Sequence, residues 1–396
     1  MNILTKLDDF IINIILKFLD NKSKILFLSC NKFTRSLLFN EICDFVFDGQ
    51  YKFCVVKNLP YIHKFSHVEY LANDTNDTNI PYGVTHLYFK YKFNESIKHC
   101  IPSSVKHLIL SQRFNQPITD SIPNGITHLT FGDYFNQPII NNIPSSLTHL
   151  TLGYSFDQDI QYIPDSVTHL TIGRYFNHTI KNYIPKSVKY LTIQSDLQSG
   201  EDLGKYITNN ITHLTFGQLF NQSVKNYIPS SVTHLTFGSC FNKSIQGCIP
   251  SSVTHLTFGI GFKQSIQNSI PSSVIYLTLG YDFNQPIQDA IPSSVTHLTF
   301  GYYFNQPIQD AMPSSLTHLT FGHQFNQPIQ DAIPLSVTYL AFGCEFYQNI
   351  KLIPSNVTHL TLGCNYRRYI NDIPNSINLS YVCPHSSSKK QSIKRI

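Results

Sequence analysis

The chain repeats one order of apolar and polar residues along most of its length. Residues 295–315 read VTHLTFGYYFNQPIQDAMPSS, and similar stretches precede and follow them at steps of 20, 21 or 23 residues. We call the first residue of this unit position 1. Position 1 is occupied by Val84, Val105, Ile126, Leu147, Val167, Val188, Ile211, Val232, Val253, Val274, Val295, Leu316, Val337 and Val357. A period of this length is typical of solenoids, propellers and other repeat arrays.

Five apolar positions recur in the unit and predict its core. Position 1 is Val, Ile or Leu, position 4 is always Leu, and position 6 is Phe, Leu or Ile. Position 10 is Phe in twelve of the fourteen copies, and position 14 is Ile or Val in the intact copies. Positions 3 to 6 alternate polar and apolar residues, which predicts a half-buried strand with positions 4 and 6 inside and positions 3 and 5 outside. The glycine at position 7 is expected to end the strand.

The length of the repeat limits what each coil can contain. A step of 21 residues is too short for a strand and a full crossover helix, so turns or a short 3₁₀ stretch are expected to complete the coil. The V-x-x-L-x-F pattern is close to the L-x-x-L-x-L pattern of leucine-rich repeats. We therefore predict a leucine-rich-repeat-like solenoid with one short parallel β-strand per coil of about 21 residues.

Position 3 carries the most chemically versatile side chains of the repeat. Three copies have Tyr190, Tyr276 or Tyr339 there. The other eleven copies have His86, His107, His128, His149, His169, His213, His234, His255, His297, His318 and His359. Neighbouring coils of a parallel solenoid lie about 4.8 Å apart, so these rings are expected to stack in one file. Repulsion between protonated rings is then expected to lower their pKa values.

Three interpretations of this file compete. A metal site needs ligands that converge, and a catalytic site needs one distinct constellation of acid, base and nucleophile. The rings are equivalent, lie in a line and can be replaced by tyrosine. These features fit a structural file that also serves as a partner-binding face better than they fit a metal site or a catalytic site. We therefore predict no catalytic or metal residues and no cofactor. Asparagine at position 11 is expected to bond backbone groups of its own and the next coil.

Composition narrows the function classes further. Charged residues make up 13% of the chain and the net charge is +5, without the concentrated basic face that nucleic-acid binding needs. The nine cysteines form no CxxC pair and no evident repeating series, so we interpret them as reduced thiols of a cytosolic chain. The apolar run in residues 10–19 is interrupted by Asn13 and Lys17. It predicts neither a signal peptide nor a membrane span.

The beginning of the chain has a different pattern. Residues 7–19 place their apolar side chains on one broad helical face. A turn with N-cap candidates follows at 20–23, and a second apolar helix is expected from about Ile25. Residues 46–79 read as a transitional segment with a strand or a degenerate first coil. An irregular stretch at 194–210 interrupts the array and is either a binding loop or tolerated drift.

The recurring F-N-Q-P-I run, for example at 304–308 and 325–329, resembles the FNIP repeat. That family is a leucine-rich-repeat relative found in amoebae and large DNA viruses. Its members often carry an F-box, and residues 7–37 resemble one, with Asp8 and Phe33 standing where the F-box usually has Pro and Trp. The matching residues are Leu7, Ile15, Leu16, Phe18, Leu19, Asp20, Cys30, Lys32 and Phe33.

The resemblance implies a domain organisation and a function. The domains would be a helical F-box-like segment (1–45), a connecting cap (46–79), a solenoid of about 14 coils (80–383) and a basic tail (384–396). The F-box would dock a Skp1-type adaptor of a cullin ubiquitin ligase, and the solenoid would bind the target protein through the position 3 file. The expected adaptor contacts are Leu7, Ile11, Ile15, Leu16, Leu19 and Phe33.

The same resemblance sets expectations for setting and partners. The protein would be a non-catalytic subunit in the cytoplasm, the host cytoplasm if it is viral. It would be monomeric apart from its adaptor and target, with no nucleic acid or membrane partner. The alternative is a repeat scaffold without any ubiquitin link, in which the N-terminal helices only cap the first coil.

Overall fold

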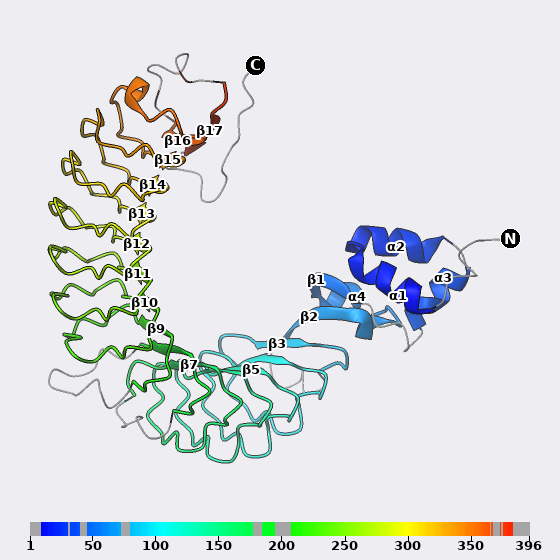
Figure 1. Cartoon of the computed structure of the whole chain (residues 1–396). Coiled ribbons are helices and arrows are strands. Elements are labelled where there is room, and N and C mark those ends of the chain that lie inside the picture. The colour runs from blue at the N-terminus through cyan, green and yellow to red at the C-terminus, as the bar shows by residue number, and fades with distance from the viewer. Residues whose placement is uncertain are drawn as a thin grey trace. The chain divides into compact units, whose positions relative to one another are not determined.

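The computed structural model describes residues 9–30, 32–39, 46–72, 80–176, 184–194, 207–364, 366, 373 and 375–382. The chain divides into two compact units, Met1–Val167 and Thr168–Ile396. Figure 1 labels the helices near the N-terminus and the succession of short strands that follows them. The domain boundaries expected at 45/46, 79/80 and 383/384 stay predictions.

The first unit contains the helices and the first six strands. Its helical elements are α1 (Asp9–Phe18), α2 (Asn21–Ser29), α3 (Lys32–Ser36), η2 (Leu37–Phe39), α4 (Phe53–Val56) and η3 (Ile62–Lys64). Its strands are β1 (Phe47–Lys52), β2 (Phe65–Ala72), β3 (His86–Phe89), β4 (His107–Ile109), β5 (His128–Thr130) and β6 (His149–Thr151). The transitional segment therefore contains two strands, of which the sequence predicted one.

The second unit is built from repeat coils. Its strands are β7 (His169–Ile172), β8 (Tyr190–Ile193), β9 (His213–Phe216), β10 (His234–Thr236), β11 (His255–Thr257), β12 (Tyr276–Thr278), β13 (His297–Thr299), β14 (His318–Thr320), β15 (Tyr339–Ala341), β16 (His359–Gly363) and β17 (Asn378–Val382). The 3₁₀ helix η6 (Ile350–Leu352) is the only helical element among the described residues of this unit.

The strands pair in parallel, each with the equivalent residues of the next coil. His234 lies opposite His255 and Leu235 opposite Leu256, and the same register joins β13 to β14. Turns complete the coils, as the step of 21 residues requires. The predicted fold class, a parallel leucine-rich-repeat-like solenoid with a few N-terminal helices, is confirmed.

The core of each coil is the set of apolar positions that the repeat predicts. Phe304 at position 10 is fully buried, and its ring centroid lies 6.2 Å from that of Phe283 and 6.1 Å from that of Phe325. Phe300 at position 6 stacks on Phe304 at 3.8 Å. The same arrangement recurs along the coils. The hydrophobic core is therefore a row of equivalent side chains, one set per coil, and not a single central cluster.

The glycine at position 7 has a reason beyond ending the strand. A Cβ atom on Gly301 would lie 1.9 Å from the carbonyl oxygen of Gly280, and one on Gly322 would lie 1.8 Å from that of Gly301. No side chain fits at such distances. Glycine is therefore required because the backbones of successive coils approach closely at this point.

Polar residues of the repeat tie each coil to the one before it. The side-chain oxygen of Asn305 accepts from the backbone N–H of Asn326 at 2.9 Å and from Nε2 of Gln327 at 3.1 Å. Ser315 donates its hydroxyl to the carbonyl of Val295 at 2.7 Å. The predicted bond from asparagine at position 11 to the next coil is confirmed. The Asn and Gln of the F-N-Q-P motif supply its two donors, a backbone N–H and a side-chain amide.

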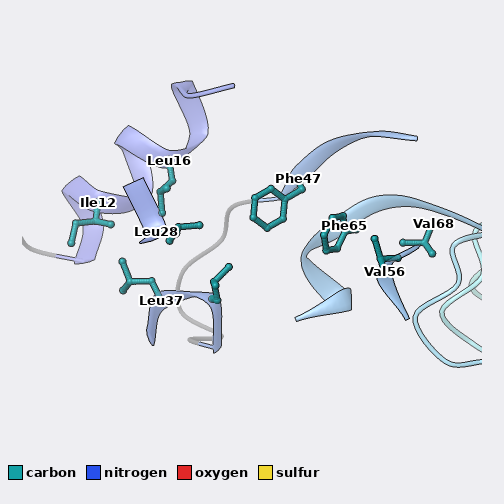
Figure 2. Packing of buried hydrophobic residues seen from close by; sticks show 9 residues of the cluster. Ile12, Leu16, Leu28, Leu37, Phe47, Val56, Phe65 and Val68 are labelled. Atoms are coloured by element: carbon teal, nitrogen blue, oxygen red, sulfur yellow. The ribbon is translucent and has the colours of Figure 1, made fainter. Parts of the chain in front are cut away.

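The N-terminal helices share a core with the first strands. Ile12 and Leu16 of α1 pack with Leu28 of α2, and the same cluster extends to Phe47 and Phe65 of β1 and β2 (Figure 2). Because they share this core, the helices cap the first strands. A solenoid needs such a cap at its end.

The second helix begins at Asn21, earlier than predicted. Asp20 caps it by accepting from the backbone N–H of Ser23 at 2.7 Å. Only Leu19 and Asp20 separate α1 from α2. The buried Lys24 then donates to the carbonyl of Val46 at 2.8 Å and pairs with Asp48 at 3.3 Å. These bonds fix α2 against β1.

Two stretches singled out in the sequence are covered only in part. The irregular stretch 194–210 is described at residue 194 and from 207 on, and its acidic residues lie outside the described residues. The incomplete last coil does contain a strand, β17, which pairs with β16. The basic tail at 384–396 lies outside the described residues.

Candidate interaction surfaces

The position 3 rings of the second unit form a stacked file. Between His169 and His318, each ring centroid lies 3.9 to 4.3 Å from the next, with interplanar angles of 6° to 28°. The spacing then opens to 5.6 Å at Tyr339 and 6.4 Å between Tyr339 and His359. The predicted stacking is present, with tyrosine and histidine interchangeable in it.

A second file lies in the first unit. The ring centroids of His86, His107, His128 and His149 follow one another at 4.0, 3.8 and 3.9 Å. His67 of β2 extends the file by stacking on His86 at 3.4 Å. The sequence pattern missed His67 because it stands outside the repeat register: Glu69, not His67, pairs with His86.

Threonine at position 2 fixes the protonation of the neighbouring ring. Thr233 donates its single hydroxyl proton to the carbonyl of Thr212 at 3.2 Å and lies 2.9 Å from Nδ1 of His234. Because that proton is already used, the ring must donate from Nδ1 to the hydroxyl oxygen. Thr254 and Thr317 repeat the arrangement with their histidines. In these rings the threonine hydroxyl therefore occupies Nδ1, and Nε2 is the other polar atom of the ring.

The surroundings of the file favour the neutral form of seven of its rings. A neutral ring that donates from Nδ1 has an unprotonated Nε2, which is a hydrogen-bond acceptor. Burial lowers the pKa of His86 to about 3, and the neighbouring histidines His107 and His67 add to the shift. Burial is also the first cause of the lowered pKa of His107, His169, His213, His234, His255 and His297. The predicted direction is confirmed for these seven rings, but its main cause is desolvation of the charged ring rather than repulsion along the file.

The strand face is more covered than the sequence suggested. Most position 3 rings and the threonines at position 5 are half-buried, because stacked neighbours shield one another. Among the described residues, no group of three or more His, Cys, Asp or Glu side chains could hold a metal ion. The file offers acceptor atoms in a row, an arrangement that suits binding of a partner with N–H or O–H donors.

The expected adaptor contacts of the N-terminal segment have different environments. Leu16 is fully buried in the intramolecular core, Ile15 and Leu19 are half-buried, and Ile11 is exposed. Leu7 and the side chain of Phe33 lie outside what the structure describes. Leu16 therefore acts on any docking surface only by holding α1 in place.

An uncovered apolar stripe lies on the other side of α1. Ile11, Ile14 and Phe18 follow at helical spacing and are 45%, 41% and 87% exposed. Ile25 and Leu26 of α2 are also exposed, at 57% and 59%. We call these five residues the helical stripe. The sequence did not separate its members from the core residues because the apolar face of the first helix is broad enough to hold both.

No helix among the described residues is long and apolar enough to cross a bilayer.

The coils, their register and the stacked files define the class of the protein: a leucine-rich-repeat-like parallel solenoid suited to protein–protein interaction. The model of the family described as FNIP Repeat matches at 75–113, 114–155, 135–162, 156–196, 203–240, 241–282, 283–324, 304–345 and 325–365. These matches cover well over half of the sequence, so the chain belongs to the FNIP repeat family.

Solved structures agree with this class. The crystal structure of CroV588, described as a novel circular LRR protein structure, is 38% identical with a TM-score of 0.64 over 81% of this chain. The match covers 50% of that protein, so this chain spans about half of its length. A leucine-rich repeat protein from Bacteroides ovatus, 14% identical over 81% of this chain and 84% of its own, has a TM-score of 0.17 and carries no argument. A search of the curated proteins found no match.

Proposed function

We propose that this protein is a substrate receptor of a Skp1–cullin–F-box ubiquitin ligase. The N-terminal helices dock a Skp1-type adaptor, and the repeat coils bind the protein to be modified. The observation that carries the proposal is the helical stripe, an apolar surface on α1 and α2 that no described residue covers.

The stripe supports docking of a helical adaptor rather than capping alone. A cap needs apolar residues only on the side that faces the solenoid, and Ile12, Leu16 and Leu28 already supply that side. Phe18 and Ile14 lie on the opposite side, where burial by a partner would remove large apolar surfaces from water. Each such side chain contributes on the order of 1.5 to 3 kcal/mol when fully buried.

The strand face supports binding of the target. Its rings are held by stacking and by the threonine bonds, so little conformational entropy is lost when a partner contacts them. Their unprotonated Nε2 atoms favour a partner that presents hydrogen-bond donors. The specificity of the receptor would then follow from the residues that vary between coils beside this constant file.

Binding of a purified Skp1-type adaptor to the full chain tests the proposal. Replacing Ile14 and Phe18 with Asp places two charges in the stripe without touching the core. We expect wild type to bind and the double variant to lose at least about tenfold in affinity, because an unpaired charge would be buried in the interface. Leu16→Asp is unsuitable for this test because it would unfold the helices.

Val55→Asp is the matched control. Val55 is an exposed apolar residue on another helix, α4, outside the stripe. It receives the same change and should leave adaptor binding unchanged. Failure of wild type to bind any adaptor, or equal binding by the Ile14 and Phe18 variant, would favour the scaffold without a ubiquitin link.

A further inference from the structure

Two cysteines that are 20 residues apart in the sequence occupy the same position of adjacent coils. Cys344 follows Gly343 after β15, and Cys364 follows Gly363 after β16, so both stand at position 8 of their units. The cysteines were interpreted from the sequence as forming no repeating series. The structure adds that this one pair stands at equivalent positions of paired coils.

The backbone brings the two residues close together. The paired strands keep an offset of 20 residues, with Tyr339 opposite His359 and Ala341 opposite Thr361. A Cβ atom on Gly363 would lie 2.5 Å from Cα of Cys344, which shows how tightly these coils approach. Neighbouring strands lie about 4.8 Å apart, and a disulfide needs Cα atoms about 4.4 to 6.8 Å apart. The backbone spacing therefore meets the requirement.

The side chains also meet. The thiol of Cys344 interacts with both the backbone N–H and the thiol of Cys364. A shared acceptor holds the pair, since the carbonyl of Val382 accepts from Sγ of Cys344 at 3.7 Å and from the backbone N–H of Cys364 at 2.9 Å. The two sulfurs thus lie on the same side of their coils, beside the last strand.

We propose that Cys344 and Cys364 form a redox-sensitive pair that a hydroperoxide oxidises to a disulfide between the last two regular coils. The bond would join coils that are otherwise held by hydrogen bonds and packing. It would also lie next to β17, which ends the described array.

The chemistry balances with the peroxide as the oxidant. Cys364 is half-exposed and reacts first: its thiolate attacks one peroxide oxygen, the O–O bond breaks, and a sulfenic acid and hydroxide form. The Cys344 thiolate then attacks that sulfur, the S–S bond forms, and the second hydroxide leaves. The two cysteine protons convert both hydroxides to water, and the two electrons lost by the sulfurs reduce the peroxide. Burial raises the pKa of Cys344 and so lowers its thiolate fraction, which disfavours Cys344 as the site of the first attack.

Oxidation of the full chain tests the proposal. The reduced protein is treated with hydrogen peroxide, and its intact mass and disulfide-linked peptides are measured without reductant. We expect loss of two hydrogen atoms and one linked peptide pair that contains Cys344 and Cys364. The oxidised protein should melt at a higher temperature than the reduced one and resist proteolysis near β16 and β17.

Three variants make the result specific. Cys364→Ser, at a half-exposed site, should abolish both the linked peptide and the rise in melting temperature. Cys240→Ser removes an exposed thiol of another coil and should change neither. Cys383→Ser removes the nearest further cysteine in the sequence and should also change neither. Linkage of Cys364 to Cys383, a disulfide between two chains, or oxidation of Cys364 to a sulfinic acid without linkage would each overturn the proposal.

Discussion

The repeat coils and the N-terminal helices differ in what their surface side chains contact. In the coils, the recurring polar side chains bond to neighbouring coils. Ser315 donates to the preceding coil, and the side-chain oxygen of Asn305 accepts from the following one. In α1 and α2, by contrast, five apolar side chains are exposed among the described residues. The contrast teaches that the array uses its recurring polar side chains for bonds between coils, whereas the helices retain a surface whose burial would be favourable.

The largest expected effect removes a ring from the core file of the coils. Phe304→Ala should lower the free energy of unfolding by about 3 to 5 kcal/mol, because it leaves a cavity between Phe283 and Phe325. A solenoid passes such a loss mainly to adjoining coils. Hydrogen exchange across residues 274–336 measures it, with the exposed Gln309→Ala as control. Exchange equal to wild type would contradict the assigned core.

The next prediction separates the two sides of α1. Leu16→Ala should cost about 2 to 5 kcal/mol because Leu16 fills the shared core. Phe18→Ala should change stability by less than about 0.5 kcal/mol, since its side chain is 87% exposed. Chemical denaturation, followed by hydrogen exchange of α1 and α2, measures both. Equal losses would remove the distinction between core and stripe.

A smaller effect tests the polar bonds of the coils. Asn305→Ala leaves the backbone N–H of Asn326 without its acceptor and Nε2 of Gln327 with only the carbonyl of residue 305, at a cost of about 1 to 3 kcal/mol. Asn305→Asp keeps an oxygen in place and should recover most of this loss. Asp157 already occupies position 11 in another coil. Similar stability of the Ala and Asp variants would show that the acceptor is unimportant.

The smallest effect concerns pH. Because burial lowers the folded pKa of His213, His234, His255 and His297, the unfolded chain binds more protons below its reference pKa of about 6.5. Their contribution to stability is full above that pH and declines as the pH falls towards the folded values. Replacing all four with Tyr should flatten the decline between about pH 6.5 and 5.

The denaturation midpoint at several pH values measures this slope. His99→Asn, at an exposed site outside the file, serves as control and should keep the wild-type slope. The change should be modest because solvent screens half-exposed rings. An equally steep decline in the fourfold variant and in wild type would exclude the file as its origin.

Sequence periodicity predicted most of the coil, because each core position recurs at one spacing. The strand at 297–299, the buried Phe304 and the stacking of His297 on His318 all follow from the alternation and the step. The bond from Thr296 to His297 was not predicted. Position 2 looked like an ordinary polar site, and only the backbone geometry places its hydroxyl beside Nδ1.

The N-terminal surface could be predicted only in outline. Leu16 and Phe18 are both large and apolar, and a broad apolar face does not reveal which part of it faces the core. The contacts with Leu28 and Phe47 decide it, and these depend on how α2 and β1 fold back. The shared position 8 of Cys344 and Cys364 can be read from the repeat, but their approach follows only from the pairing of β15 with β16.

The direction of the side-chain bonds has a consequence for synthesis on the ribosome. Ser315, Thr317 and Gln327 all reach acceptors on the coil that precedes them in the chain. A coil emerging during translation therefore finds those acceptors already ordered, and its own carbonyls become the template for its successor. Growth from the N-terminus satisfies these groups in the order in which they are made, whereas growth from the opposite end would leave each donor waiting for a coil not yet folded.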